Sequence, residues 1–255
     1  MSEIWLVGAG PGDPDWLTRK AAQLIERADL LVYDALVSPE ILALAAKNAT
    51  LLAVGRRSGD DPRWPARAAW LLPDGRLAPQ IVQSARSGHT VVRLKGGDPG
   101  VFGRLQEELL AITEAGLTPK IVPGISAASA AAATLGIPLT ERGQASSVTF
   151  ATAHLATERE PDSWPTQGTL VLYMGLGRLP ALVTALRRRG WSASTPAAVV
   201  SRASTKSERV VVGTLATLAD DVARAQLATP AVLMVGEVVR HAGQAALETL
   251  ACAAE

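Results

Sequence analysis

A glycine-rich turn follows the first apolar segment and constrains both the fold and the ligand. Ile4–Val7 predicts a strand, and Val7–Pro14, which reads Val-Gly-Ala-Gly-Pro-Gly-Asp-Pro, leads from it into a predicted helix. The glycine spacing differs from the G-x-G-x-x-G of dinucleotide-binding turns. Pro11 removes a backbone donor that a diphosphate needs, and Asp13 adds a competing negative charge. The turn therefore favours a ligand with a nucleoside and a positive charge over a diphosphate.

Short apolar runs alternate with helical patterns along the whole chain, which predicts an α/β fold. The first helix is expected to begin at Asp13 and Pro14, with an apolar face that includes Leu17 and Ala21. The expected strands form two sets of five: Ile4–Val7, Leu30–Tyr33, Leu51–Val54, Thr90–Leu94 and Lys120–Val122, then Ser147–Thr152, Thr169–Tyr173, Ala197–Val200, Glu208–Gly213 and Ala231–Val235.

Two sets of strands predict two α/β domains. An alanine-rich helix is expected to begin at Ser126, and the join is placed just after it, at Ile137–Thr140. The predicted division is an N-terminal α/β domain over 1–138, a C-terminal α/β domain over 139–243 and a tail over 244–255. Residues 58–79 are rich in proline and glycine and form either a lid or an ordinary surface loop.

Composition excludes several functional classes. Lys and Arg total 25 against 24 Asp and Glu, so no global field favours nucleic acid or a membrane surface. Cys252 is the only cysteine, which excludes an intrachain disulfide, and the three histidines lack metal-ligand spacing, so no metal is expected. The longest apolar stretch, around Ala127–Leu135, is far shorter than the roughly 20 residues of a membrane span. We expect a soluble, cytoplasmic protein.

Four turns punctuated by glycine or proline follow predicted strands: Gly8–Pro14, Gly96–Pro99, Pro123–Ser126 and Met174–Gly177. In open α/β sheets, ligands bind beyond the carboxyl ends of the strands. Within the second turn, Pro99 biases Asp98 to an extended conformation, which can hold its carboxylate toward a ribose or an amine. Together the four turns predict a ligand site.

Several longer motifs carry a family resemblance. They run in order from about residue 3 to residue 240, and together they resemble the tetrapyrrole (corrin/porphyrin) methylase family, particularly its members that methylate uroporphyrinogen III. The matching stretches are Val7–Pro14, Val32–Pro39, Val91–Pro99 with Val101–Arg104, Val122–Ser126, Gly136–Thr140, Leu172–Gly175, Val210–Leu215, and Pro230–Ala231 with Val235–Val239.

The resemblance implies two α/β domains with a cleft between them for S-adenosylmethionine, which leaves as S-adenosylhomocysteine. It also implies a homodimer that methylates two ring carbons of uroporphyrinogen III to give precorrin-2, a precursor of sirohaem, cobalamin and haem d1. The cofactor contacts implied by the family match are Pro11, Gly96, Gly97, Asp98, Val101, Ser126, Ala127, Met174, Ala203 and Ala231.

The tetrapyrrole implied by the resemblance carries eight carboxylates, so a near-neutral protein must concentrate cations locally. The candidates are Arg57, Arg104, Arg142 and His154. The resemblance also places Arg104 and Glu107 at the tetrapyrrole and Asp34 at the mouth of the site. We expect the protein to hold the ring carbon and the methyl group about 3–3.5 Å apart. Arg104 would then orient the substrate and stabilise charge, and Glu107 or the carboxylates of the substrate would take protons.

The chain departs from the family pattern on the substrate side. The usual Gly-Arg-Gly-Gly-Glu-Glu is here Gly103-Arg-Leu-Gln-Glu-Glu108, and the usual Leu-Thr-His-Arg is Leu139-Thr-Glu-Arg142. Three alternatives therefore stay open: a methylase of a later corrin precursor, a degenerate tetrapyrrole binder without catalysis, and a nicotinamide oxidoreductase. Pro11 argues against the oxidoreductase, as does the lack of the acidic residue expected after the second strand, because Asp34 sits in a different motif.

Overall fold

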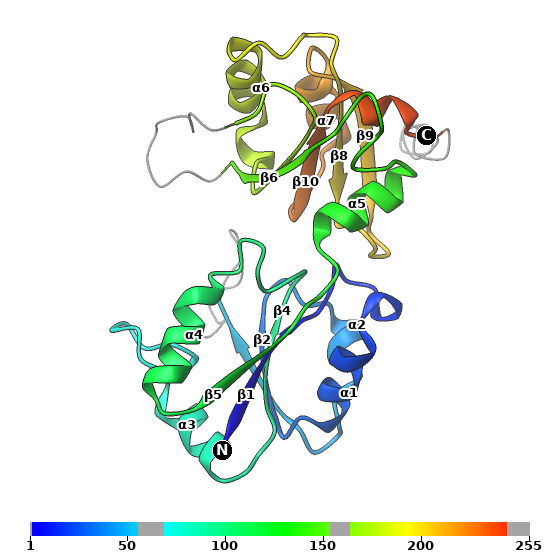
Figure 1. The fold of residues 1–255 in the computed structure, drawn as a ribbon. Coiled ribbons are helices and arrows are strands. Elements are labelled where there is room, and N and C mark those ends of the chain that lie inside the picture. The colour runs from blue at the N-terminus through cyan, green and yellow to red at the C-terminus, as the bar shows by residue number, and fades with distance from the viewer. Residues whose placement is uncertain (1, 56–68, 154–163, 244–255) are drawn as a thin grey trace. The chain divides into compact units, whose positions relative to one another are not determined.

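The computed structural model describes residues 2–55, 69–153 and 164–243. Its contacts divide the chain into two compact units, Met1–Ser126 (unit 1) and Ala127–Glu255 (unit 2). All ten predicted strands are present, with ends shifted by at most two residues. The predicted α/β class is confirmed, and each unit contains one five-stranded sheet (Figure 1).

Unit 1 is built on a fully parallel sheet. Its strands lie in the order β3-β2-β4-β1-β5. The central pair is set by Ile4 opposite Val91, and all four strand pairings are parallel. Because the strands are parallel, their carboxyl ends lie at one edge of the sheet. The bounds are β1 Glu3–Gly8, β2 Leu30–Asp34, β3 Thr50–Val54, β4 Val91–Lys95 and β5 Thr118–Val122.

Helices cover both faces of this sheet, which explains its nearly continuous apolar strands. Helices α1 (Arg19–Arg27) and α2 (Pro39–Leu42) lie on one face, and α3 (Pro79–Arg86) and α4 (Leu105–Glu114) lie on the other (Figure 1). Two separate buried clusters result, and alternate strand residues contribute to each. The sheet is therefore a rigid platform for the loops that follow its strands.

The first helix differs from the prediction. Asp13 and Pro14 begin only a 3-10 turn, Pro14–Trp16, and the backbone at Leu17 is extended. The helix α1 starts afresh at Arg19, where the hydroxyl of Thr18 accepts the amide of Ala21 at 3.2 Å. The chain thus has two helix caps in succession, Asp13 and Thr18, and the second begins the longer helix.

Unit 2 has a mixed sheet in the order β6-β7-β10-β8-β9. Strands β6 and β7 are parallel and the other pairs are antiparallel. Leu182 and Leu186 of α6 and Leu218 of α7 pack on its apolar face. The bounds are β6 Val148–Thr152, β7 Thr169–Tyr173, β8 Pro196–Ser201, β9 Arg209–Thr214, β10 Ala231–Val235, α5 Ala127–Leu135, α6 Leu179–Arg188 and α7 Leu218–Ala225, with 3-10 turns at Leu176–Arg178 and Glu237–His241.

The alanine-rich helix α5 starts at Ala127, directly after the predicted Ser126. The sequence places α5 at the end of the first domain, whereas the contacts group it with unit 2. The Thr134 hydroxyl donates to the Glu208 carboxylate at 2.8 Å, and the Gly243 amide donates to the carbonyl of Leu135 at 3.4 Å. These bonds tie α5 to the elements that follow it.

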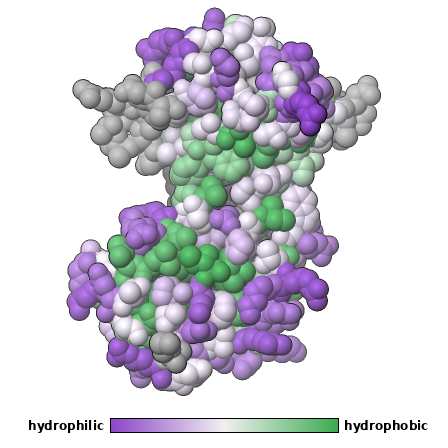
Figure 2. All heavy atoms as spheres, in the orientation of Figure 1, coloured by the Kyte–Doolittle hydropathy of each residue, from purple (hydrophilic) through white to green (hydrophobic). Residues whose placement is uncertain are grey.

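On the face shown in Figure 2, both units carry hydrophobic areas bordered by hydrophilic residues. Across the described ranges, every helix is too short or too polar to span a bilayer. The described residues also contain no cluster of three His, Cys, Asp or Glu side chains suited to a metal ion.

Candidate functional site

The connections of unit 1 diverge at the carboxyl ends of two neighbouring strands. Strands β1 and β4 pair directly, but the chain leaves β1 toward α1 on one face and β4 toward α4 on the other (Figure 1). Adjacent strands whose connections leave to opposite faces mark the ligand position in open α/β sheets. The turns after β1, β2, β4 and β5 meet at this edge.

Three glycines let these turns pack backbone against backbone. A Cβ on Gly8 would lie 2.5 Å from the amide nitrogen of Gly124 and 2.8 Å from the carbonyl oxygen of Gly97. A Cβ on Gly124 would lie 2.3 Å from that same carbonyl. Beyond them, Gly10 and Gly97 exchange two backbone hydrogen bonds of 3.1 and 2.7 Å. The loops after β1, β4 and β5 therefore form one tightly packed unit.

Two carboxylates accept further backbone amides at this edge. Asp98 accepts the amide of Gly100 at 2.8 Å and that of Gly124 at 3.0 Å. Asp34, the last residue of β2, accepts the amide of Leu36 at 2.9 Å and that of Gly96 at 3.3 Å. Asp34 does stand at the strand end where a dinucleotide-binding protein has its acidic residue, which corrects the sequence-based argument, but its two oxygens already bind backbone.

The backbone donors of the glycine turns are therefore used inside the protein. Amides of five glycines bind carbonyls or carboxylates of the same unit: Gly10, Gly96, Gly97, Gly100 and Gly124. A diphosphate needs such amides to be directed at it. With these donors occupied and two carboxylates nearby, this edge of the sheet suits a neutral or cationic ligand, in agreement with the sequence argument.

The turn after β4 ends in an unusual start to α4. Phe102 and Arg104 both have left-handed backbones, with φ of 53° and 52°. The Arg104 side chain is 63% exposed, and its Nε donates to Glu107 Oε1 at 2.7 Å. The structure thus brings together the two residues predicted at the tetrapyrrole, and it leaves the terminal guanidinium nitrogens of Arg104 at the surface. Val101 lies in the same turn, and its amide donates to the Asp98 carbonyl at 3.2 Å.

Beneath this turn lies a buried ionic cluster that the sequence argument missed. Lys95 Nζ lies 2.8 Å from Glu108 Oε1, and Arg93 Nε lies 3.4 Å from the same oxygen. All three side chains are at least nine-tenths buried. Burial and the neighbouring Arg93 charge lower the pKa of Lys95, against the opposing effects of Glu108 and Asp34. The available signal was two cations at alternate positions of an otherwise apolar strand.

In unit 2, the start of α5 is bonded to the end of β7. The Tyr173 hydroxyl accepts the amide of Ala128 at 3.1 Å. Ala127 directly precedes Ala128, and Met174 directly follows Tyr173. The bond therefore ties together two chain segments that each carry a predicted cofactor contact. Met174 has a left-handed backbone, with φ of 57°, and is 55% exposed. The backbone at β7 thus turns sharply and leaves a thioether side chain at the surface.

Two further predicted contacts lie together in unit 2. Ala231 begins β10 and pairs with Ser201 at the end of β8, and Ala203 follows two residues later. The Glu208 carboxylate accepts the amide of Ser204 at 2.5 Å and fixes the turn between β8 and β9. Arg142 is exposed in a separate turn, and no described contact joins it to these residues. Arg57 and His154, also predicted at the substrate, lie outside the described residues.

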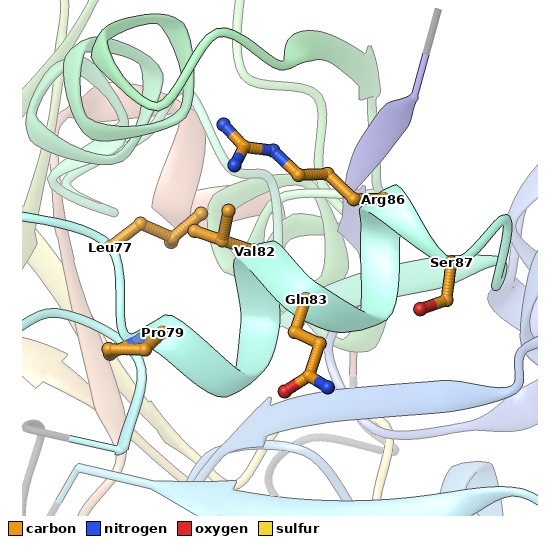
Figure 3. Close-up of a pocket in the computed structure, with 6 residues that line it drawn as sticks. All are labelled: Leu77, Pro79, Val82, Gln83, Arg86 and Ser87. Atoms are coloured by element: carbon orange, nitrogen blue, oxygen red, sulfur yellow. The ribbon is translucent and has the colours of Figure 1, made fainter.

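A shallow surface pocket of about 510 Å³ lies along α3 (Figure 3). It is lined by Leu77, Pro79, Val82, Gln83, Arg86 and Ser87. None of these residues was predicted to bind the cofactor or the tetrapyrrole. The candidate site is therefore defined by the turns at the strand ends rather than by this pocket.

Comparisons with known proteins identify the family of the chain. The family model of the tetrapyrrole (corrin/porphyrin) methylases matches residues 3–219. The chain belongs to the tetrapyrrole methylase family. The resemblance predicted from the motifs is thereby confirmed.

Curated tetrapyrrole methylase relatives include longer proteins. The chain is 44% identical to the sirohaem synthase of Gluconobacter oxydans over 244 residues, which cover 94% of this chain and 50% of the relative. It is also 44% identical to the sirohaem synthase of Pseudomonas entomophila, over 93% of this chain and 50% of the relative. The chain thus spans about half the length of these relatives.

Solved structures show the same fold. A uroporphyrin-III C-methyltransferase from Thermus thermophilus, complexed with S-adenosylhomocysteine, has a TM-score of 0.74 and 35% identity over 93% of this chain and 99% of that one. A cobalt precorrin-4 methyltransferase has a TM-score of 0.80 and 26% identity over 93% of this chain and 96% of that one. The fold is therefore shared by methylases named for different tetrapyrroles.

Proposed function

We propose that the chain transfers methyl groups from S-adenosylmethionine to two ring carbons of uroporphyrinogen III, giving precorrin-2. The observation that carries the proposal is the occupied set of glycine amides at the strand ends, which favours a nucleoside with a cationic centre over a diphosphate. Membership of the methylase family and likeness to a structure holding S-adenosylhomocysteine support the same ligand.

The residues present fit this cofactor. In unit 1 we propose contacts from Pro11, Gly96, Gly97, Asp98 and Val101, which share one packed set of turns, and from Ser126. In unit 2 we propose contacts from Ala127, Met174, Ala203 and Ala231. Small side chains and a thioether suit the flat adenine ring, and carbonyl groups at the strand ends suit a sulfonium. The bound cofactor supplies an electrophilic methyl group.

The residues of the chain then orient the acceptor. Arg104 can bind a substrate carboxylate through its exposed nitrogens while its Nε stays on Glu107. Glu107 or the carboxylates of the substrate take the proton that leaves the macrocycle, and Asp34 lies at the mouth of the site. Arg57, Arg142 and His154 supply further contacts to the acidic substrate. Methyl transfer itself requires chiefly that the two carbons be held in line at short distance.

Mass spectrometry of the product tests the reaction. Purified protein is incubated with uroporphyrinogen III and isotopically labelled methyl donor, and two added methyl groups are expected. A product with no added methyl group would contradict the proposal. Turnover of Arg104→Lys tests the arginine separately, since near-normal activity would reject a role for the planar guanidinium fork.

Three alternatives give different results. A methylase of a later corrin precursor would leave uroporphyrinogen III unchanged and methylate the corrin instead. A binder without catalysis would take up S-adenosylhomocysteine and transfer nothing. An oxidoreductase would bind NADH and not S-adenosylhomocysteine in calorimetry. The first of these alternatives, a methylase of a later corrin precursor, is favoured by one observation, the cobalt precorrin-4 methyltransferase with the same fold.

We also propose that the protein works as a cytoplasmic homodimer. The family resemblance supports the dimer, and a single cysteine in 255 residues suits a reducing compartment. Sedimentation equilibrium of the purified chain tests the dimer, and a monomer at micromolar concentration would contradict it.

A further inference from the structure

The buried Lys95 side chain connects the end of β4 to α4 beneath the glycine turn. Residues alternate along a strand, so Val91, Arg93 and Lys95 share the sheet face that α4 covers (Figure 1). Lys95 Nζ donates to Glu108 Oε1 at 2.8 Å, with side-chain exposures of only 5% and 3%. Lys95 directly precedes Gly96, and Glu108 lies in the first turns of α4. The pair therefore anchors both ends of the 96–104 turn.

The turn itself is shaped around the lysine stem. A Cβ on Gly103 would lie 3.1 Å from Lys95 Cε and 2.5 Å from the carbonyl oxygen of Pro99. Phe102 and Arg104, on either side of Gly103, have left-handed backbones that L residues rarely adopt. Such conformations persist only where the surroundings hold them. The stem of Lys95 is part of those surroundings.

Neutralising Glu108 does not require Lys95. Arg93 lies 3.4 Å from the same Glu108 oxygen, donates to the Leu94 carbonyl at 2.9 Å, and has its guanidinium over the ring of Trp70. One cation would balance one carboxylate, and a buried ion pair is weak evidence of stabilisation. Lys95 also experiences the charge of Asp34 at the end of β2, so its ammonium lies between two carboxylates that both adjoin the 96–104 turn.

We propose that Lys95 is a positioning residue for the methyl donor. Its bond to Glu108 fixes the 96–104 turn, which carries Asp98 and Val101 to the cofactor, whereas Arg93 balances charge and binds the strand and Trp70. The inference rests on the proposed function and deepens it.

A matched pair of variants tests this assignment. Lys95→Met and Arg93→Met each remove one cation from the same buried cluster, and each leaves Glu108 with the other cation. The stem of Lys95 lies against Gly103 of the turn, whereas Arg93 donates to the Leu94 carbonyl within the strand. Calorimetry with S-adenosylhomocysteine should show binding weakened about tenfold or more in Lys95→Met and changed less than about threefold in Arg93→Met. Thermal unfolding of both variants shows whether a difference in affinity merely follows a difference in stability.

The outcomes separate the possibilities. A selective loss in Lys95→Met at comparable melting temperatures supports the positioning role. Equal losses that track the melting temperature, or no loss in either variant, overturn it. If Lys95→Met is insoluble, Gly103→Ala pushes on both the Pro99 carbonyl and the Lys95 stem, and it should weaken binding similarly; unchanged affinity would overturn the role. Wild-type protein that does not bind S-adenosylhomocysteine would overturn the proposed function and this inference with it.

Discussion

Replacing Gly8 by alanine should disrupt the packed turns at the candidate site. The new methyl carbon would lie 2.5, 2.6 and 2.8 Å from backbone atoms of Gly124 and Gly97, whereas ordinary contacts start at 3.4 Å. Backbone atoms cannot move aside as a flexible side chain does, so β1 and the turn after β5 must separate by about 1 Å. We expect a loss of about 3 kcal/mol, at the upper end of ordinary overpacking costs.

Two control variants separate the sources of this loss. Gly88→Ala places a side chain in open space at a φ of +85°, so it measures conformational strain alone, about 1 kcal/mol. Gly177→Ala has neither strain nor a close neighbour and should change stability by less than about 0.5 kcal/mol. Urea unfolding followed by circular dichroism gives the three values. The Gly8→Ala loss corresponds to a melting temperature roughly 10 °C lower.

Binding provides the second measurement. Gly8→Ala should weaken the binding of S-adenosylhomocysteine at least about tenfold, because the turns that carry Gly97 and Asp98 are displaced. Gly88→Ala, which lies after α3, should bind as the wild type does. If Gly8→Ala is as stable as Gly88→Ala and binds the ligand equally well, the close packing of these turns has no functional importance and the reasoning fails.

Three further predictions use other bonds at the strand ends. Asp98→Asn replaces one acceptor oxygen with an amide group that repels a backbone donor, so it should lower the free energy of unfolding by about 1–3 kcal/mol. It should also weaken the binding of S-adenosylhomocysteine in calorimetry. Unchanged stability together with unchanged affinity would contradict the role of the carboxylate. Tyr173→Phe leaves the Ala128 amide without its hydroxyl acceptor and should cost about 1 kcal/mol in urea unfolding, and an unchanged midpoint would show that the bond contributes nothing. The lowered pKa of Lys95 means that the unfolded chain binds more protons here, so this residue favours folding increasingly as the pH rises toward 10.5. The difference in unfolding free energy between wild type and Lys95→Met should therefore shift in favour of the wild type as the pH rises toward 10.5, and a difference independent of pH would refute the shift.

Much of the fold is local in origin and could be predicted. Most strands are apolar runs bounded by glycine, proline or polar residues, which is why the strands could be found from the sequence. The start of the first helix was misplaced because Asp13 and Thr18 are both good caps, and only the packing of α1 favours the second. The predicted cleft between two domains and the roles of the substrate residues stay predictions.

The candidate site was also predicted only in part. Sequence located the turns, and Pro11 and Asp13 correctly argued against a diphosphate. It did not reveal that the amides of Gly96 and Gly124 bind carboxylates, because these partners are 62 and 26 residues away in the chain. The same limit hid the bond between Tyr173 and Ala128, which spans 45 residues.

By itself, the order of short apolar segments and glycine turns determined the α/β class, the family and the kind of ligand, because each of these signals is contained within a few adjacent residues. Only the tertiary structure decided which charged groups are buried. Arg93 and Lys95 stand out in the sequence as cations within an apolar strand, but Glu108 looks like a solvated helix residue. The three meet because a parallel strand and the helix after it pack face to face, and this pairing is a property of the packing that the local pattern does not encode.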